Sequence, residues 1–330
     1  MPFATKTYYW VFGFVVAAIP FVRFSPERLI QAFCIGLAAN AVIAILQFAG
    51  IFPIMNPVAY GLDLGSSTMA AFLNLGILIV SRYFRDTNDK GKRTFYALFM
   101  GVFFFHLIIM RGRTGIFTFF VVSPLILRNL FGRIKILRMV LIYEVLIGIM
   151  LLSPIVWDRI YWSMDQLKHH LSLDPKSAWG KTWDVQENRL FLWRGAIRIF
   201  SEHPIVGVGT GGYPVVMHQN GNPDWPFPAH PHNNFLYVAV SFGLVGIFAL
   251  TWFFGEMFKN GWEERQTHSG YFIFSTALVI FISGIFNTQI IDSSTAFLLS
   301  VAVGLQNGLP RFSGAVTPHV PEAQTIKDTP

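Results

Sequence analysis

The chain has 330 residues, of which 53% are hydrophobic and only 13% are charged, and its mean hydropathy is +0.49. Because a soluble domain carries about twice that share of charged residues, this composition excludes an ordinary water-soluble protein. The net charge of +7 does not indicate nucleic-acid binding, since the basic residues gather in short segments between apolar blocks. We therefore expect an all-α membrane protein with no nucleic-acid partner.

The apolar blocks are long enough to cross a bilayer and predict a polytopic bundle of about nine transmembrane helices. The predicted spans cover residues 7–22, 27–50, 66–84, 94–112, 114–131, 136–156, 233–258, 270–288 and 293–307. They divide the chain into an N-terminal bundle of six spans at 1–156, a loop domain at 157–232, C-terminal spans at 233–309 and a polar, disordered tail at 310–330.

Basic residues mark alternate connections and thereby predict the orientation. Lys and Arg gather after the first, third and fifth spans, whereas residues 51–65 and 288–293 contain none, and residues 157–232 hold seven basic and seven acidic side chains. Cytoplasmic loops carry the excess of Lys and Arg. We therefore expect the N-terminus outside, the tail inside, and the large, partly helical loop on the periplasmic or exterior side.

Two arginines, Arg111 and Arg113, stand in the short exterior turn between the fourth and fifth predicted spans. Charges so close to the hydrocarbon are costly and usually face a cavity or a partner, which makes a bound anion one explanation. The alternative is that both side chains snorkel to the lipid interface.

The loop at 157–232 is long for a connection without a function, and it holds six of the nine histidines. Residues 187–201 within it predict an amphipathic helix. Its apolar residues are Leu190, Phe191, Ile197 and Phe200, and its basic residues are Arg189, Arg194 and Arg198. These arginines fit either anion binding or a stripe that faces solvent or lipid headgroups.

A glycine-rich run from His203 to Tyr213 follows this predicted helix and allows close backbone approach to a ligand. It lacks the preceding strand, the following helix and the Lys-Ser/Thr ending of a nucleotide-binding loop, so we do not expect a phosphate cradle of that kind.

A pair of histidines, His230 and His232, stands directly before the seventh predicted span. A histidine with its ordinary pKa of about 6.5 suits general-base catalysis on a hydroxyl group. Two alternatives remain open. The pair could supply two zinc ligands, although no third is evident, or one or both histidines could cap the span or bond to the loop.

The order of these features resembles the O-antigen ligase and Wzy-type polymerase superfamily of bacterial lipid-linked glycan transferases. The matching stretches are Arg111-Gly112-Arg113-Thr114-Gly115, Arg189 followed by Trp193, the glycine-rich run after His203, and His230-x-His232-Asn233. The resemblance is clear from roughly residue 94 to residue 260. Family members carry more spans than this chain, which leaves open whether N-terminal helices are missing.

The resemblance implies an inverting, metal-independent transfer of a glycan from undecaprenyl diphosphate to an acceptor hydroxyl, with no cofactor. Guanidinium groups suit the leaving diphosphate because they stay charged and bind phosphate oxygens in pairs. Arg113 and Arg189 are expected to bind it, with Arg111 and Arg194 as weaker candidates.

His232 is expected to take the proton of the acceptor, and His230 is the second choice or a positioning partner. The expected partners are the carrier-linked glycan donor, a lipid A-core or glycan acceptor, and membrane lipids.

Several functions fit this pattern. The compact His-Pro-His-Asn motif and the paired arginine sites favour a ligase over a polymerase that extends carrier-linked glycan or an enzyme that glycosylates protein. A lipid-linked glycan transporter belongs to a different class; it would explain arginines along an anion path but has no need of the histidine pair. A non-catalytic scaffold would need neither feature.

Overall fold

A computed structural model describes residues 11–18, 25–54, 60–62, 65–110, 113–132, 136–151, 189–219 and 229–308, with four single residues between 157 and 168. All regular structure in these ranges is helical. The all-α prediction is therefore confirmed for the described part of the chain, while the predicted tail at 310–330 lies outside it.

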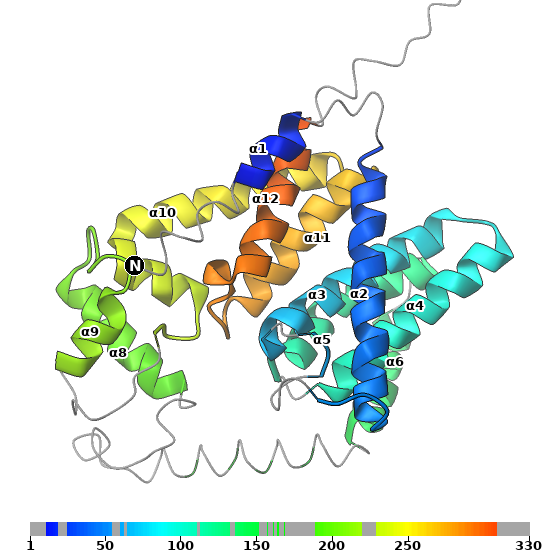
Figure 1. Cartoon of the computed structure of the whole chain (residues 1–330), viewed down its shortest axis with the longest axis horizontal. Coiled ribbons are helices and arrows are strands. Elements are labelled where there is room, and N and C mark those ends of the chain that lie inside the picture. Colours follow the sequence, from blue (N-terminus) through cyan, green and yellow to red (C-terminus); the bar gives the residue numbers. More distant parts are fainter. Residues whose placement is uncertain are drawn as a thin grey trace, which may run out of the picture.

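The helices follow the apolar blocks of the sequence (Figure 1). Their bounds are α1 (Val11–Ala18), α2 (Glu27–Phe48), α3 (Ser66–Asp86), α4 (Lys90–Ile109), α5 (Arg113–Phe131), α6 (Ile136–Leu151), α8 (Arg189–Glu202), α9 (Gly212–Gln219), α10 (Asn234–Glu263), α11 (His268–Ser283) and α12 (Ser293–Gly308), with the short turn η3 (Gln289–Ile291) before α12. Each predicted span overlaps one of these helices, and α8 matches the predicted amphipathic helix.

Five of the described helices are long and apolar enough to cross a membrane. They are α2, α3, α4, α10 and the Thr114–Phe131 part of α5. α11 has 16 residues, and at 1.5 Å per residue it spans about 24 Å, less than the roughly 30 Å of hydrocarbon. The number of nine spans therefore stays a prediction, whereas a multi-helix membrane protein is supported.

The core of the bundle is α3, which packs on α4, α5 and α11. Its apolar window is 83% buried inside the protein, compared with 22% for α4. A helix that is apolar on all sides and enclosed by its neighbours is a central element. α3 is therefore the frame against which the other spans are placed.

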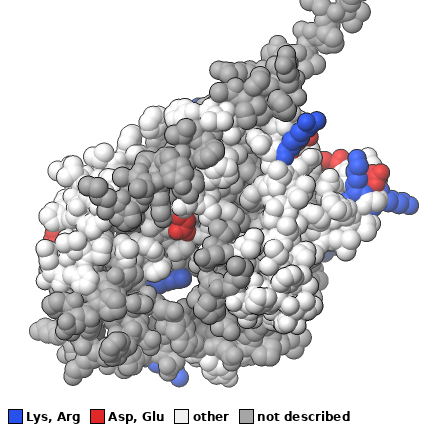
Figure 2. All heavy atoms as spheres, in the orientation of Figure 1, with Lys and Arg blue, Asp and Glu red and all other residues white. Residues whose placement is uncertain are grey.

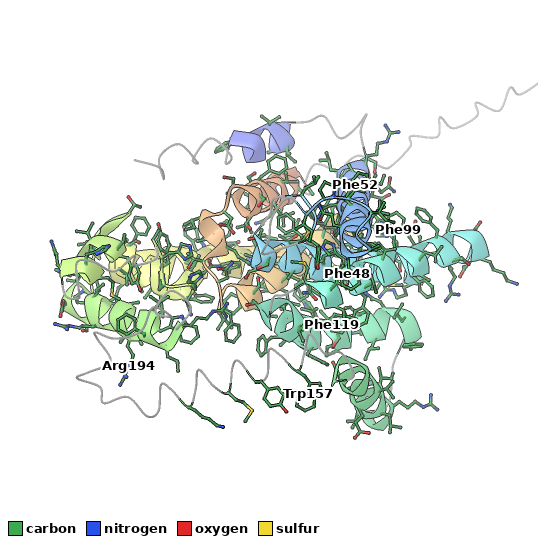
Figure 3. The ribbon with its side chains drawn as sticks, turned by 60° about the horizontal axis from the view of Figure 1, so that its bottom comes forward. Phe48, Phe52, Phe99, Phe119, Trp157 and Arg194 are labelled. Carbon is green, nitrogen blue, oxygen red and sulfur yellow. The ribbon has the colours of Figure 1, made fainter. Side chains whose placement is uncertain are left out.

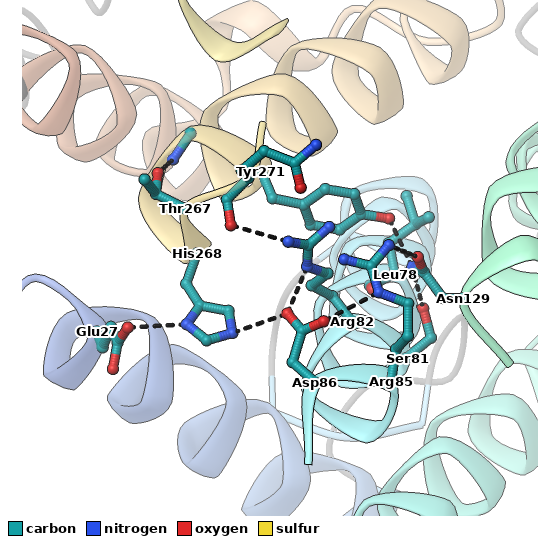
Figure 4. A network of polar contacts seen from close by, with 12 residues as sticks. Glu27, Leu78, Ser81, Arg82, Arg85, Asp86, Asn129, Thr267, His268 and Tyr271 are labelled. Atoms are coloured by element: carbon teal, nitrogen blue, oxygen red, sulfur yellow. Dashed lines mark hydrogen bonds and ion pairs between the residues drawn. The ribbon is translucent and has the colours of Figure 1, made fainter. Parts of the chain in front are cut away.

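One end of the bundle, which we call the charged end, joins the start of α2, the end of α3 and the start of α11 (Figure 4). Asp86 accepts hydrogen bonds from Arg82 at 2.6 Å and Arg85 at 2.9 Å. His268 lies between two carboxylates, with Nδ1 2.8 Å from Glu27 and Nε2 3.4 Å from Asp86. These contacts fix three helices relative to one another.

α10 is interrupted at Gly243, where φ is 63° and ψ is −151°, and Figure 1 shows its two halves running in different directions. The glycine-rich turn after α8 fills the break. Four backbone hydrogen bonds of 2.8 to 3.4 Å cross it, from Val208 N to Val240 O, Gly209 N to Ser241 O, Leu244 N to Pro204 O and Val245 N to Ile205 O. They replace helical bonds that the break removes, which is essential where lipid offers no partner.

The glycine-rich turn therefore approaches the backbone of α10 closely, and glycine is needed at the contact because a side chain would not fit. A Cβ at Gly207 would lie 2.4 Å from Val240 O, and one at Gly243 would lie 2.3 Å from the carbonyl carbon of Ile205. The expectation that no helix follows this turn was wrong, because α9 begins at Gly212.

The buried face of α8 also differs from the apolar face expected from its largest side chains. The residues at the contact are Leu192, Gly195, Ala196 and Ile199, which pack on α9 and α10. Leu190 and Ile197 are exposed instead. Small residues occupy the buried face because they let α8 approach the Met217 side chain of α9 closely. A Cβ at Gly195 would clash with the sulfur of Met217.

Candidate functional site

The candidate site lies at the end of the bundle opposite the charged end, where α3, α5 and α10 begin and α11 ends. We call it the site end. The connection from Gly284 to Asp292 holds these helix starts together: Gln289 Nε2 donates to Ser67 O at 2.8 Å, and Thr68 donates to Asp292.

His232 has a backbone conformation set apart from that of its neighbours. Its φ is 52°, and among the described residues it alone has a positive φ without being glycine. Such a conformation costs of order 1–3 kcal/mol and persists only where surrounding contacts impose it. The rings of His230 and His232 meet edge to face at 4.5 Å, so the structure brings the two predicted catalytic residues together.

The cap of α10 belongs to Asn233 and not to either histidine. Its side-chain oxygen accepts a hydrogen bond from Leu236 N at 2.9 Å, as an N-cap residue does. The part of the alternative in which a histidine caps this span is therefore wrong.

Residues of the turn from Gly284 to Thr288 contact the start of α10 and the residues just before it. Gly284 O accepts from Asn234 N at 2.7 Å, and Ile285 O accepts from Asn233 Nδ2 at 2.8 Å. Asn287 Oδ1 lies 3.3 Å from His232 Nδ1, and Thr288 Oγ1 accepts from Asn233 N at 2.9 Å.

The remaining residue of this turn, Phe286, links the site to the two arginine-bearing helices. Its ring lies 4.9 Å from that of Phe117 on α5 and 6.2 Å from that of Trp193 on α8. Along the chain, Phe117 is one helical turn after Arg113, and Trp193 is one helical turn after Arg189. The first turns of α5 and α8 therefore meet beside the residue that precedes Asn287.

Two buried polar atoms near these helix starts have no hydrogen-bond partner among the described residues: Thr114 Oγ1 and Trp193 Nε1. Buried polar groups are usually paired, so the partners of these two atoms are expected outside the described residues or in a bound molecule or water. Figure 2 shows basic side-chain atoms on one face of the molecule, with acidic atoms a little apart from them.

The structure describes the side chains of only two of the four predicted arginines, Arg189 and Arg194. Arg189 is half-buried at the first position of α8, and Arg113 opens α5, although its side chain lies outside the described part. Arg111 also lies outside it. Arg194 is exposed and points away from the bundle in Figure 3, so the structure does not bring it to the histidines.

Sequence reasoning missed the partners contributed by the connection before α12, namely Phe286, Asn287, Thr288 and Asp292. A signal was present, because a polar run of Asn, Thr and Gln at 287–289 separates two apolar blocks. No group of three His, Cys, Asp or Glu side chains suited to a metal occurs within the described ranges, so the zinc alternative lacks a described third ligand.

Residues 95–251 match the model of a protein family described as O-antigen ligase. This region of the chain is similar to the O-antigen ligase family. It begins in α4, ends within α10 and contains both histidines and all four predicted arginines, whereas the turn at 284–288 lies beyond it.

Two relatives described as candidate polysaccharide ligases are similar to the chain. One, from Rickettsia conorii, is 29% identical over 104 residues, which cover 29% of this chain and 23% of that protein. The other, from Rickettsia felis, is 26% identical over 195 residues, which cover 57% of this chain and 43% of that protein. The chain thus matches less than half of the length of either relative. The confirmed resemblance supports a ligase-like role.

Proposed function

We propose that the protein is an O-antigen ligase-like glycosyltransferase that moves a glycan from undecaprenyl diphosphate to a hydroxyl of lipid A-core, by inversion and without a metal ion. The observation that carries this proposal is the set of contacts made by the adjacent residues Phe286 and Asn287. One residue joins the starts of α5 and α8 through its ring, and the next contacts His232. His232 and the starts of α5 and α8, which both begin with an arginine, thus lie near one turn, and this supports the proposal.

In the proposed reaction, the acceptor oxygen attacks the anomeric carbon as the bond from that carbon to the phosphate oxygen breaks. The acceptor proton passes to His232, or to His230 as the second candidate, and the electron pair of the broken bond leaves with the diphosphate. The transition state carries positive charge on the sugar and growing negative charge on the leaving group. Arg113 and Arg189 stabilise that negative charge, with Arg111 and Arg194 as weaker candidates.

The site end faces the periplasm in this proposal, and the protein resides in the bacterial inner membrane. The support is the distribution of charge. Arg82 and Arg85 lie at the charged end with the Lys and Arg residues that open α4, as expected of a cytoplasmic face. A carrier-linked glycan would then reach the site from the outer leaflet.

The test is transfer of a labelled glycan from undecaprenyl diphosphate by purified protein in detergent, with EDTA present. Lipid A-core and carrier-linked glycan are offered as acceptors in separate reactions. Product on lipid A-core supports the ligase, and product only on carrier-linked glycan would replace it with a polymerase. Lack of product with either acceptor from folded protein would contradict a transferase and favour a lipid-linked glycan transporter.

A further inference from the structure

The turn from Gly284 to Thr288 lies outside the region matched to the family, yet each of its five residues contacts the candidate site. We propose that Asn287 in this turn is a positioning residue that sets the tautomer and the ring orientation of His232. This inference rests on the proposed function, because it assigns His232 the role of proton acceptor.

The first step of the argument is the direction of the hydrogen bond between the two side chains. Asn287 Oδ1 lies 3.3 Å from His232 Nδ1. An amide oxygen only accepts, so the proton of the neutral imidazole is on Nδ1 and the basic lone pair is on Nε2. Asn287 therefore selects which ring nitrogen receives the acceptor proton.

The second step is that the backbone around His232 is held by the neighbour of Asn287. Thr288 Oγ1 accepts from Asn233 N at 2.9 Å, directly after the residue with a φ of 52°. Adjacent residues of one turn thus fix the backbone and the ring of the same histidine. A side chain locked in this way is positioned for transfer before the substrate arrives.

The third step concerns the charge that forms during transfer. When Nε2 takes the acceptor proton, the imidazole becomes a cation and both ring nitrogens donate. Asn287 Oδ1 continues to accept from Nδ1 in that state, so no rearrangement is needed. His230, whose ring lies 4.5 Å away, is a titratable neighbour that touches the same imidazole from its own segment.

The experiment compares Asn287→Leu and Asn287→Asp with wild type in the glycan-transfer assay, over a range of pH. We expect Asn287→Leu to lower kcat about 10- to 100-fold, as for a misplaced catalytic group, with little change in KM. We expect Asn287→Asp to retain most of the wild-type kcat. We expect its pH profile to have an acid limb that lies about one pH unit higher than in wild type, because a carboxylate stabilises the imidazolium.

Asn260→Leu is the matched control, since Asn260 lies at the other end of α10 and its side chain bonds within that helix. It is expected to leave kcat and the pH profile unchanged. A wild-type kcat in Asn287→Leu, or an acid limb that stays in place in Asn287→Asp, would overturn the inference while leaving the transferase intact. Inactive wild type, or an active His232→Gln variant, would instead overturn the proposed function and the inference with it.

Discussion

His232 combines a left-handed backbone with contacts from a distant turn. The sequence identified it and His230 as candidates, because two histidines before an apolar span are unusual in composition. It could not identify Asn287, which is 55 residues away along the chain and reaches His232 only after α11 has packed beside α10. Side-chain partners of this kind depend on tertiary packing, and local residue patterns do not specify them.

Arg189 provides a residue-scale test of diphosphate binding. Arg189→Ala is expected to lower kcat/KM for the carrier-linked donor by about 10- to 100-fold, since a hydrogen bond to a charged group contributes roughly 1.5–3 kcal/mol. Initial rates measured over a range of donor concentrations check this expectation.

Arg198→Ala is the matched control on the same helix. Arg198 is exposed and pairs with Glu202 at 2.9 Å, so its loss is expected to change kcat/KM less than twofold, as for a surface ion pair. Equal effects of the two substitutions would contradict a specific role for Arg189.

At the scale of elements, the apolar blocks predicted the helices well, because a span must satisfy its own backbone hydrogen bonds. The sequence did not predict two features, the break in α10 and the helix α9. The break in α10 was not evident, since Gly243 lies within a continuous apolar block and the bonds that compensate the break come from the turn after α8. α9 was missed because Gly and Pro open it, although Pro is well tolerated in a first helical turn.

The break in α10 predicts that alanine substitutions at two glycines of this helix differ in their effect on stability. Gly243→Ala is expected to destabilise the fold by at least about 1–3 kcal/mol, because alanine cannot relax at this φ and ψ and its Cβ would overlap Ile205. Thermal unfolding in detergent should show a lower midpoint for this variant.

Gly255→Ala in the same helix serves as the control, because a Cβ there meets nothing within 4 Å. Its midpoint should match or exceed that of wild type, since alanine favours helix. If both variants unfold at the same temperature, the account of the break is wrong.

At the scale of the whole molecule, the contacts separate a site end from a charged end. Basic residues in alternate connections had predicted two such faces, and Figure 4 shows that the charged end is also a joint between helices. The proposal that the charged end meets the cytoplasm rests on the positive-inside rule. The packing of Phe286 between α5 and α8 had no counterpart in the sequence pattern, since it joins three separate segments.

The orientation can be measured by cysteine labelling in a Cys34→Ser background, since Cys34 is the single cysteine of the chain. A cysteine at the exposed Thr210, in the glycine-rich turn, is expected to react with a membrane-impermeant maleimide in intact cells. One at the exposed Asn88, at the charged end, should react only after the inner membrane is opened. The reverse pattern would invert the proposed topology.

The most direct test of the central claim is the initial rate of glycan transfer by His232→Gln beside His203→Gln. Both histidines lie between α8 and the start of α10, but His203 is exposed at the end of α8. Loss of a general base lowers a rate by roughly 10²–10⁴-fold, so we expect that loss in His232→Gln and less than a twofold change in His203→Gln. A His232→Gln protein that transfers glycan at the wild-type rate would contradict the account.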